Sequence, residues 1–149
     1  MSSAKITAAV ALTLSNLVAA AEEPTGFLCV SEAATGFGYN AATKSWQVTK
    51  FKATANYLLT RSSRTGAKWE VKEVGSRSPS MFCQADLSQE QLLSCQGFGA
   101  EFRFNGKLLR FMYTYTVGYW NEDTALAIAP GRKEGDDTPA LVIGKCSPL

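Results

Sequence analysis

Alternation of apolar and polar residues with a period of two is the feature that most constrains the fold of this chain. From Leu109 to Tyr119, apolar and aromatic side chains occupy every second position, and arginine, methionine, threonine or glycine fills the positions between them. Successive side chains of a β-strand point to opposite faces of a sheet, so this pattern predicts a long strand with one buried face.

A hairpin is predicted immediately before this strand. An Asn-Gly pair at 105–106 separates two alternating runs, and Asn-Gly is preferred in two-residue hairpin turns because both turn positions need positive φ. A two-residue turn predicts that Phe102 faces Leu109 on the core side of the sheet. The same register places Glu101 opposite Arg110 on the outer side, where the two charges attract.

Shorter alternating segments indicate several more strands. Turn-forming residues cluster at 40–45 and 62–66, and each cluster is predicted to connect the two strands of a hairpin. The further strands predicted, in chain order, are 26–31, 37–39, 46–48, 56–61, 68–74, 80–84 and 140–145.

A single short helix is predicted at 89–94. Ser88 precedes this segment and Gln91 lies three residues further on, which is the spacing of a capping box. About seven to nine short strands with one short helix predict an all-β fold, either an antiparallel β-barrel or a β-sandwich.

The first residues have the layout of a cleavable signal peptide. Lys5 is followed by a short apolar segment at 6–18 and then by Ala19–Ala21. The apolar segment is too short and too often interrupted for a membrane-spanning helix, which needs about 20 apolar residues. We therefore expect residues 1–21 to be removed on export to the periplasm or the medium. Residues 22–149 are expected to form one domain without a membrane span.

Four cysteines lie in the part that follows the signal segment. An even number of cysteines in an exported chain predicts disulfides, and four cysteines allow three pairings. We favour Cys83–Cys95, which closes a short loop, together with Cys29–Cys146, which joins the two ends of the domain. A structural zinc site is disfavoured because there is no Cys-x-x-Cys pair and no histidine.

The composition argues against catalysis. The absence of histidine removes the commonest general base and a frequent metal ligand. No serine lies in a Gly-x-Ser-x-Gly context, and Glu70, Glu73 and Glu101 fit exposed strand positions at least as well as a catalytic carboxylate pair. The 15 Lys and Arg nearly balance the 13 Asp and Glu, without the clustered basic face typical of nucleic-acid binding. We expect a non-enzymatic protein with no cofactor, no metal and no nucleic-acid partner.

Two loops carry the candidate binding residues. One follows the predicted strand 56–61, and the other is the charged segment 121–138. The arginines of the first loop, with neighbouring aromatic residues, would suit a protein-binding face. The aromatic residues of the 109–119 strand would either fill the core or line a cavity for a small apolar ligand. The candidate residues on the two loops are Arg61, Arg64, Asn121, Asp123 and Arg132.

Two blocks of sequence are distinctive. The first is Thr-Gly-Phe-Gly-Tyr-Asn at 35–40 with Thr-Lys-Ser-Trp at 43–46, and the second is Ile-Gly-Lys-Cys-Ser-Pro at 143–148. They resemble a group of small exported proteins of Gram-negative bacteria with unassigned function. The resemblance implies a periplasmic or secreted protein and brings no activity with it. The chain also resembles the barrel-type inhibitors of lysozyme, because it has one cysteine in an early strand and another near its end. The Ser-Gly-x-x-Tyr loop of those inhibitors is not evident here.

From these observations we expect a non-enzymatic exported protein of the cell envelope. Its partner would be an envelope protein or a small apolar ligand. One alternative is a periplasmic inhibitor of a cell-wall hydrolase, which would present a protruding loop. A hydrolase that uses carboxylates alone is a further alternative.

Overall fold

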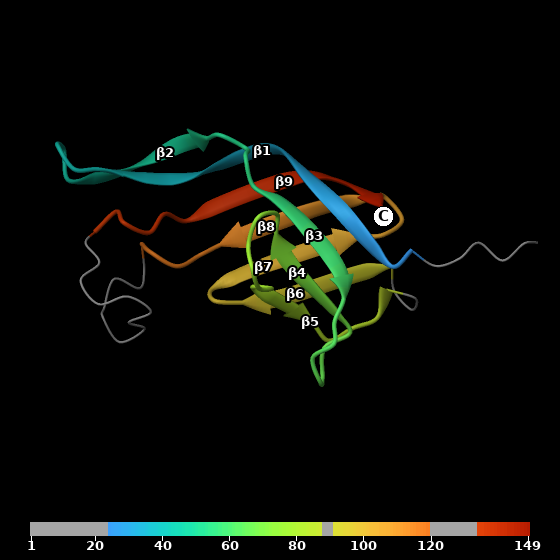
Figure 1. The fold of residues 1–149 in the computed structure, drawn as a ribbon. Coiled ribbons are helices and arrows are strands. Elements are labelled where there is room, and N and C mark those ends of the chain that lie inside the picture. Colours follow the sequence, from blue (N-terminus) through green and yellow to red (C-terminus); the bar gives the residue numbers. More distant parts are fainter. Residues whose placement is uncertain (1–23, 88–90, 120–133) are drawn as a thin grey trace, which may run out of the picture.

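The structure, a computed structural model, describes residues 24–87, 91–119 and 134–149. These residues form nine β-strands joined by turns and loops (Figure 1). In chain order the strands are β1 (Gly26–Asn40), β2 (Ser45–Phe51), β3 (Asn56–Arg61), β4 (Trp69–Glu73), β5 (Met81–Cys83), β6 (Leu92–Gly97), β7 (Ala100–Asn105), β8 (Arg110–Tyr115) and β9 (Ala140–Pro148).

An antiparallel barrel of eight strands forms the body of the domain. The strands are hydrogen-bonded in the order β2-β1-β3-β4-β5-β6-β7-β8-β9, and β1 also pairs with β9. The β1–β9 pairing closes the ring and leaves β2 outside it as an extra strand. The predicted all-β class, and the barrel as its architecture, are therefore confirmed.

Strand β1 belongs both to the barrel and to a hairpin that extends from it. Residues 26–30 pair with β3, and residues 34–40 pair with β2 along the same edge of β1. On its other edge β1 pairs with β9, with a register shift between Ser31 and Ala33. We call the hairpin of residues 34–51 the arm; it extends to the upper left in Figure 1.

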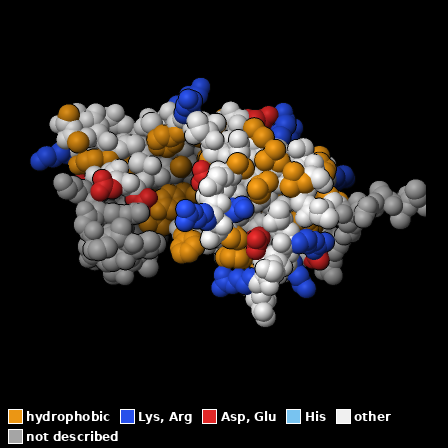
Figure 2. Space-filling view, in the orientation of Figure 1, with side chains coloured by type: hydrophobic (Ala, Val, Ile, Leu, Met, Phe, Trp, Pro, Cys, Tyr) orange, Lys and Arg blue, Asp and Glu red, His pale blue; other side chains and the backbone are white. Residues whose placement is uncertain are grey.

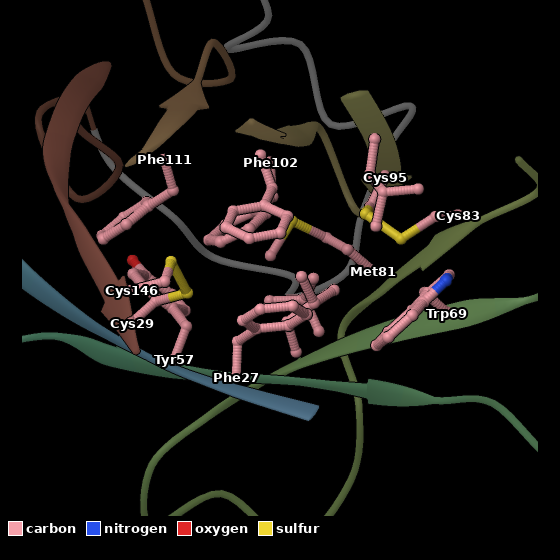
Figure 3. Close-up of a cluster of buried hydrophobic side chains, with 14 of the residues drawn as sticks. Phe27, Cys29, Tyr57, Trp69, Met81, Cys83, Cys95, Phe102, Phe111 and Cys146 are labelled. Carbon is pink, nitrogen blue, oxygen red and sulfur yellow. A yellow bond between two sulfur atoms is a disulfide. The ribbon is translucent and has the colours of Figure 1, made fainter. Parts of the chain in front are cut away.

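Aromatic rings pack against one another inside the barrel (Figure 3). The rings of Phe102 and Phe111 stack with centroids 5.0 Å apart, and those of Phe27 and Phe104 are 4.7 Å apart. Alternate residues of each strand point inward, so every strand of the barrel contributes to this core. The buried hydrophobic residues are Phe27, Cys29, Ala34, Tyr57, Leu59, Trp69, Val71, Met81, Cys83, Leu93, Cys95, Phe102, Phe104, Phe111, Val142 and Cys146.

Both disulfides join residues that face each other on neighbouring strands. Cys29 and Cys146 are register partners on β1 and β9, and Cys83 and Cys95 are register partners on β5 and β6. Their Cα atoms are 3.9 Å and 4.0 Å apart. These are the pairings favoured from the sequence. Two buried disulfides indicate that the protein folds in an oxidising environment.

The predicted hairpin between β7 and β8 forms, but with a different register. Phe102 faces Tyr113 rather than Leu109, and Glu101 faces Thr114 rather than Arg110. The turn is longer than two residues. It begins after Asn105, whose side-chain Oδ1 accepts a hydrogen bond from the Leu108 N–H at 2.9 Å. It ends at Leu109, which adopts a positive φ of 52°.

The predicted helix at 89–94 is wrong over its second half, because residues 92–94 lie in β6. Leu93 and Cys95 point into the core, and β6 pairs along its whole length with β7, which satisfies more backbone groups than a single helical turn could. Residues 89 and 90 lie outside the described residues, as does the predicted signal peptide at 1–21. Within the described residues, no helix has the length and apolar character to span a membrane.

Candidate functional site

An open groove lies on the outer face of the barrel, across β5, β6, β7 and β8. Its volume is about 1100 Å³. Its floor is formed mostly by outward-pointing residues of these four strands, with the buried residues Leu93, Phe104 and Phe111 between them, and the loop between β3 and β4 forms one wall. We call this feature the outer groove. Its lining residues are Arg64, Thr65, Gly66, Ala67, Phe82, Gln84, Ala85, Leu92, Leu93, Ser94, Gln96, Arg103, Phe104, Asn105, Arg110, Phe111 and Met112.

Strand register brings the polar floor residues together. Ser94 of β6 faces Arg103 of β7, and Arg103 in turn faces Met112 of β8. Asn105 of β7 faces Arg110 of β8. Directly opposite residues on one face of a sheet have their Cβ atoms about 5 Å apart, so Arg103 and Arg110 are diagonal neighbours on the groove floor.

The β3–β4 loop carries a third arginine to the groove. The Arg64 guanidinium lies over the Phe82 ring, with Cζ 4.4 Å from the ring centroid. The loop is held against β5 because the Lys68 N–H donates to the Cys83 carbonyl at 2.8 Å. Within the loop, the Arg64 N–H donates to Ser62 Oγ at 3.1 Å. The wall that carries Arg64 is thus bonded to the strand that carries Phe82.

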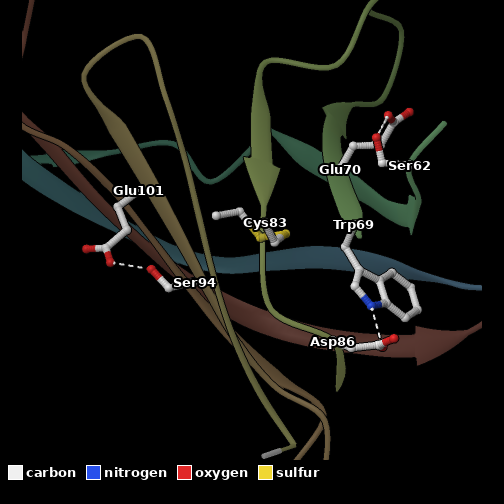
Figure 4. The surroundings of a disulfide bond; sticks show 8 residues. Ser62, Trp69, Glu70, Cys83, Asp86, Ser94 and Glu101 are labelled. Atoms are coloured by element: carbon white, nitrogen blue, oxygen red, sulfur yellow. Dashed lines mark hydrogen bonds between the residues drawn. A yellow bond between two sulfur atoms is a disulfide. The ribbon is translucent and has the colours of Figure 1, made fainter. Parts of the chain in front are cut away.

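Positive charge dominates the outer groove. Arg64, Arg103 and Arg110 line it, and no Asp or Glu is among the lining residues in the described part of the chain. Glu101 lies beside the groove and accepts a hydrogen bond from Arg103 Nε at 2.8 Å. It accepts another from Ser94 Oγ, also at 2.8 Å (Figure 4). The hydrogen bond from Arg103, and then that from Ser94, lower the pKa of Glu101. Glu101 therefore partly offsets Arg103, while Arg64 and Arg110 form no ion pair with any described residue.

Arg61, the other arginine predicted to bind a partner, is used within the domain. Its Nη1 lies 2.7 Å from Asp86 Oδ1, and its guanidinium lies 4.3 Å from the centroid of the Trp69 ring. Trp69 Nε1 donates to the same Asp86 oxygen at 3.3 Å (Figure 4). These contacts tie the segment after β5 to β3 and β4. The predicted binding residues Asn121, Asp123 and Arg132 lie outside the described residues.

Tyrosine rings from β3 and β8 form a second cluster at the arm end of the barrel. Tyr57 and Tyr113 stack with centroids 5.4 Å apart, and the Tyr115 hydroxyl donates to Asp137 Oδ2 at 2.8 Å. Burial, followed by the charges of Tyr115 and Glu73, raises the pKa of Tyr113 to about 12. Burial is also the main cause that raises the pKa of Tyr57. The strand predicted at 109–119 is shorter in the structure, where β8 runs from Arg110 to Tyr115 and Tyr119 is exposed. The rings on the inward face of β8 pack against other rings.

The carboxylates considered from the sequence are spread over the barrel. Glu70 accepts a hydrogen bond from Ser62 Oγ at 2.8 Å, and Glu101 accepts one from Ser94 Oγ on a different part of the barrel (Figure 4). Glu73 is the last residue of β4, near the tyrosine cluster. Within the described residues, no group of three or more His, Cys, Asp or Glu is placed to hold a metal ion.

Of the predicted binding residues, the structure brings only Arg64 into the outer groove, among those it describes. Sequence reasoning missed Phe82, Arg103 and Arg110, which are far apart in the chain. The alternation at 92–96 would have placed Ser94 on an outer face, but it was interpreted as a helix. Comparisons of the chain with protein-family models, with curated proteins and with solved structures gave no match.

Proposed function

We propose that this protein is a non-enzymatic binding protein of the cell envelope, and that its ligand is a small anionic molecule held in the outer groove. The observation that carries the proposal is the set of three arginines along a groove without a lining carboxylate among the described residues. The two disulfides, together with the export signal predicted at residues 1–21, support a periplasmic or secreted location.

The side chains of the groove suit a ligand that has both charge and hydroxyl groups. Guanidinium groups bind carboxylates and phosphates through two parallel hydrogen bonds, so Arg64 and Arg110 supply the charge recognition. The amide groups of Gln96 and Asn105 can donate to ligand hydroxyls, and Ser94 Oγ, which donates to Glu101, can accept from them. An acidic sugar has this chemistry. The volume is close to the range of small-molecule sites, about 300–1000 Å³.

Apolar surface next to the arginines supports the same class of ligand. Phe82, Leu92 and Met112 line the groove between the polar residues. Leu92 is 52% exposed, so a bound ligand would remove apolar surface from water as well as pair charges. The apolar face of a sugar ring would lie against these side chains. The ligand expected from the structure is therefore anionic rather than purely apolar.

The β3–β4 loop, which a hydrolase inhibitor would insert into an enzyme, projects from the barrel (Figure 1), but its two arginines contact their own domain. Arg61 contacts Trp69 and Asp86, and Arg64 lies on Phe82. An inserting arginine would have to give up these contacts. This favours the groove proposal over the inhibitor alternative.

Titration with defined oligosaccharides tests the proposal. Trigalacturonic acid is added to the isotopically labelled protein and backbone amide shifts are followed by NMR, with the neutral galactose trimer as the matched ligand. Shifts are expected at Ser94, Gln96 and Met112 with the acidic trimer. Arg64→Ala and Arg110→Ala should each weaken binding about 10-fold or more, because a charged hydrogen bond is lost. Arg77→Ala, an exposed arginine outside the groove, should leave affinity unchanged.

Two results would contradict the proposal that an anionic ligand binds in the outer groove. Equal affinity for the acidic and neutral trimers would remove the argument from charge. Shifts that follow the acidic trimer but map outside β5–β8 would place the site elsewhere on the domain.

A further inference from the structure

The arm has one strand whose outer edge is open. Along an antiparallel strand, the N–H and C=O of one residue point to the same edge, and successive residues alternate between edges. The Phe37 N–H of β1 donates to the Pro139 carbonyl at 3.1 Å, so the residues on either side of Phe37 point toward β2. Their register partners, Thr49 and Gln47, point back toward β1.

Trp46, Val48 and Lys50 therefore direct their N–H and C=O groups away from β1. In the described part of the chain, β2 pairs with no strand other than β1. An edge strand of this kind is a template for one more strand. It follows that an extended segment can gain backbone hydrogen bonds here without any rearrangement of the barrel.

Exposed apolar side chains lie beside this edge. Val48 is 80% exposed and its register partner Phe37 is 48% exposed. In Figure 2 the arm, at the upper left, carries hydrophobic side chains together with lysine at its surface. The neighbouring pair Tyr39 and Trp46 is covered differently, because Trp46 contacts the Tyr119 ring and donates to Glu134. Phe37 and Val48, the next pair along the arm on that side, therefore stay exposed and can contact a partner.

The charge of the arm selects the occupant. Lys44, Lys50 and Lys52 lie on or beside β2, and residues 40–55 contain no Asp or Glu. The carboxylate of Glu134 is bonded to the Trp46 ring near the turn, whereas Lys50 and Lys52 lie toward the other end of the strand. None of the three lysines forms an ion pair with a described residue. An extended segment that carries carboxylates would complement this edge, whereas a basic segment would be repelled.

The same lysines disfavour a second copy of the chain as the occupant. Antiparallel pairing of two β2 edges about Val48 would bring Lys44 of one copy close to Lys52 of the other at both ends. Like charges that face each other across a sheet are destabilising. Lysine on an edge strand is also a common defence against self-association.

We propose that β2 binds an extended acidic segment of a partner protein, which adds to the sheet as a further strand. Residues two apart share a face of a strand, so the bound segment carries an apolar residue opposite Val48 and a carboxylate two positions away, opposite Lys50. This site is separate from the outer groove, whose lining residues do not include any residue of the arm.

Peptide titration tests the proposal. The blocked heptapeptide Thr-Glu-Thr-Val-Thr-Glu-Thr is added to the labelled protein and compared with the same peptide in which lysine replaces glutamate. The acidic peptide should shift the amides of Trp46, Val48 and Lys50, and its affinity should fall as salt is raised. Lys50→Glu should weaken binding about 5-fold, since one charge pair becomes a repulsion.

Val48→Pro is the decisive variant. The Val48 N–H faces the open edge, so proline removes a group that the arm itself does not use and blocks the added strand. Binding should fall about 10-fold or more, while the amide spectrum of the barrel is retained. Arg110→Ala should leave peptide binding intact, which separates this proposal from that of the groove.

Three outcomes would overturn the proposal. The first is no preference of the arm for the acidic peptide over the basic one. The second is unchanged binding by the Val48→Pro protein. The third is a dimer in light scattering that Val48→Pro converts to a monomer, which would make a second copy the occupant.

Discussion

Cys29 and Cys146 face each other across the two strands that close the barrel, and their disulfide spans the seam between the first and last strands. The Cys83–Cys95 disulfide instead joins β5 to β6, which are close in sequence. The separations are 117 and 12 residues. The two bonds therefore constrain the unfolded chain to very different extents.

Loss of the seam disulfide should destabilise the domain more than loss of the other. In the chain-entropy description, the longer loop contributes about 4.7 kcal/mol and the shorter about 3 kcal/mol. Urea unfolding of C29A/C146A and C83A/C95A measures both losses in the free energy of unfolding. A larger loss for C83A/C95A would show that strain or packing, rather than chain entropy, sets the order.

Gly144 of β9 should not tolerate a side chain. A Cβ at this position would lie 2.1 Å from the Val30 carbonyl oxygen and 2.5 Å from Phe111 Cε1. Gly144→Ala should lower the free energy of unfolding by about 2–3 kcal/mol, because backbone and core ring must both move.

Gly66→Ala is the matched control for Gly144→Ala. A Cβ at Gly66 meets nothing within 4 Å, although its φ of +84° is unfavourable for alanine. Its cost should be about 1 kcal/mol. Equal losses at the two positions in thermal or urea unfolding would contradict the close approach at Gly144.

Neighbouring proline substitutions on β2 should have opposite effects on the arm. Val48→Pro leaves the ladder with β1 intact, whereas Thr49→Pro removes an N–H that points toward β1. Nuclear Overhauser contacts between the Tyr39 and Trp46 rings, which are 5.5 Å apart, report the state of the hairpin. We expect these contacts to persist in Val48→Pro and to disappear in Thr49→Pro. The reverse result would mean that the edge assignment of β2 is inverted.

The tyrosine cluster should make the protein sensitive to alkali. The folded pKa of Tyr113 is raised to about 12 from 10.0, so the neutral phenol is favoured by folding. The stability from this group is fully present below about pH 10 and is lost as the pH rises toward 12. Allowing for partial exposure, the loss should be about 1–2 kcal/mol.

Tyr113→Phe isolates this contribution. The variant should lose less stability than the unmodified protein between pH 10 and 12, as measured by urea unfolding at each pH. Tyr119→Phe, at an exposed position outside the cluster, serves as the control. An identical pH dependence for all three proteins would exclude a role for the buried phenol.

Local patterns in the sequence predict most of the strands and both disulfides. Alternation at 109–119 and the turn residues at 40–45 and 62–66 each depend on a few neighbouring residues. The β7–β8 register was missed because the turn depends on a side-chain hydrogen bond of Asn105 and on positive φ at Leu109. Neither is visible in the Asn-Gly pair itself.

The outer groove could not be predicted in the same way. It exists because β5, β6, β7 and β8 lie side by side and because the β3–β4 loop is hydrogen-bonded to β5. In the sequence, Arg64, Arg103 and Arg110 each resemble an ordinary exposed residue of a strand or loop. The hairpin of the arm was predicted, with its turn at 40–45, and the pairing of β1 with β2 confirms it. Its continuity with the strand predicted at 26–31 was missed, because a register shift near Ser31 allows β1 to run without a break from Gly26 to Asn40.

The pairing of β1 with β9 also determines when folding can be completed. A chain that lacks residues 140–148 has an unpaired edge on β1 and another on β8. In the folded domain β9 pairs with both of these edges, and the long separation of β1 and β9 along the chain makes the closing step slow. The barrel is thus assembled only after its last strand is available, and until then the chain stays open, extensible and vulnerable to proteases.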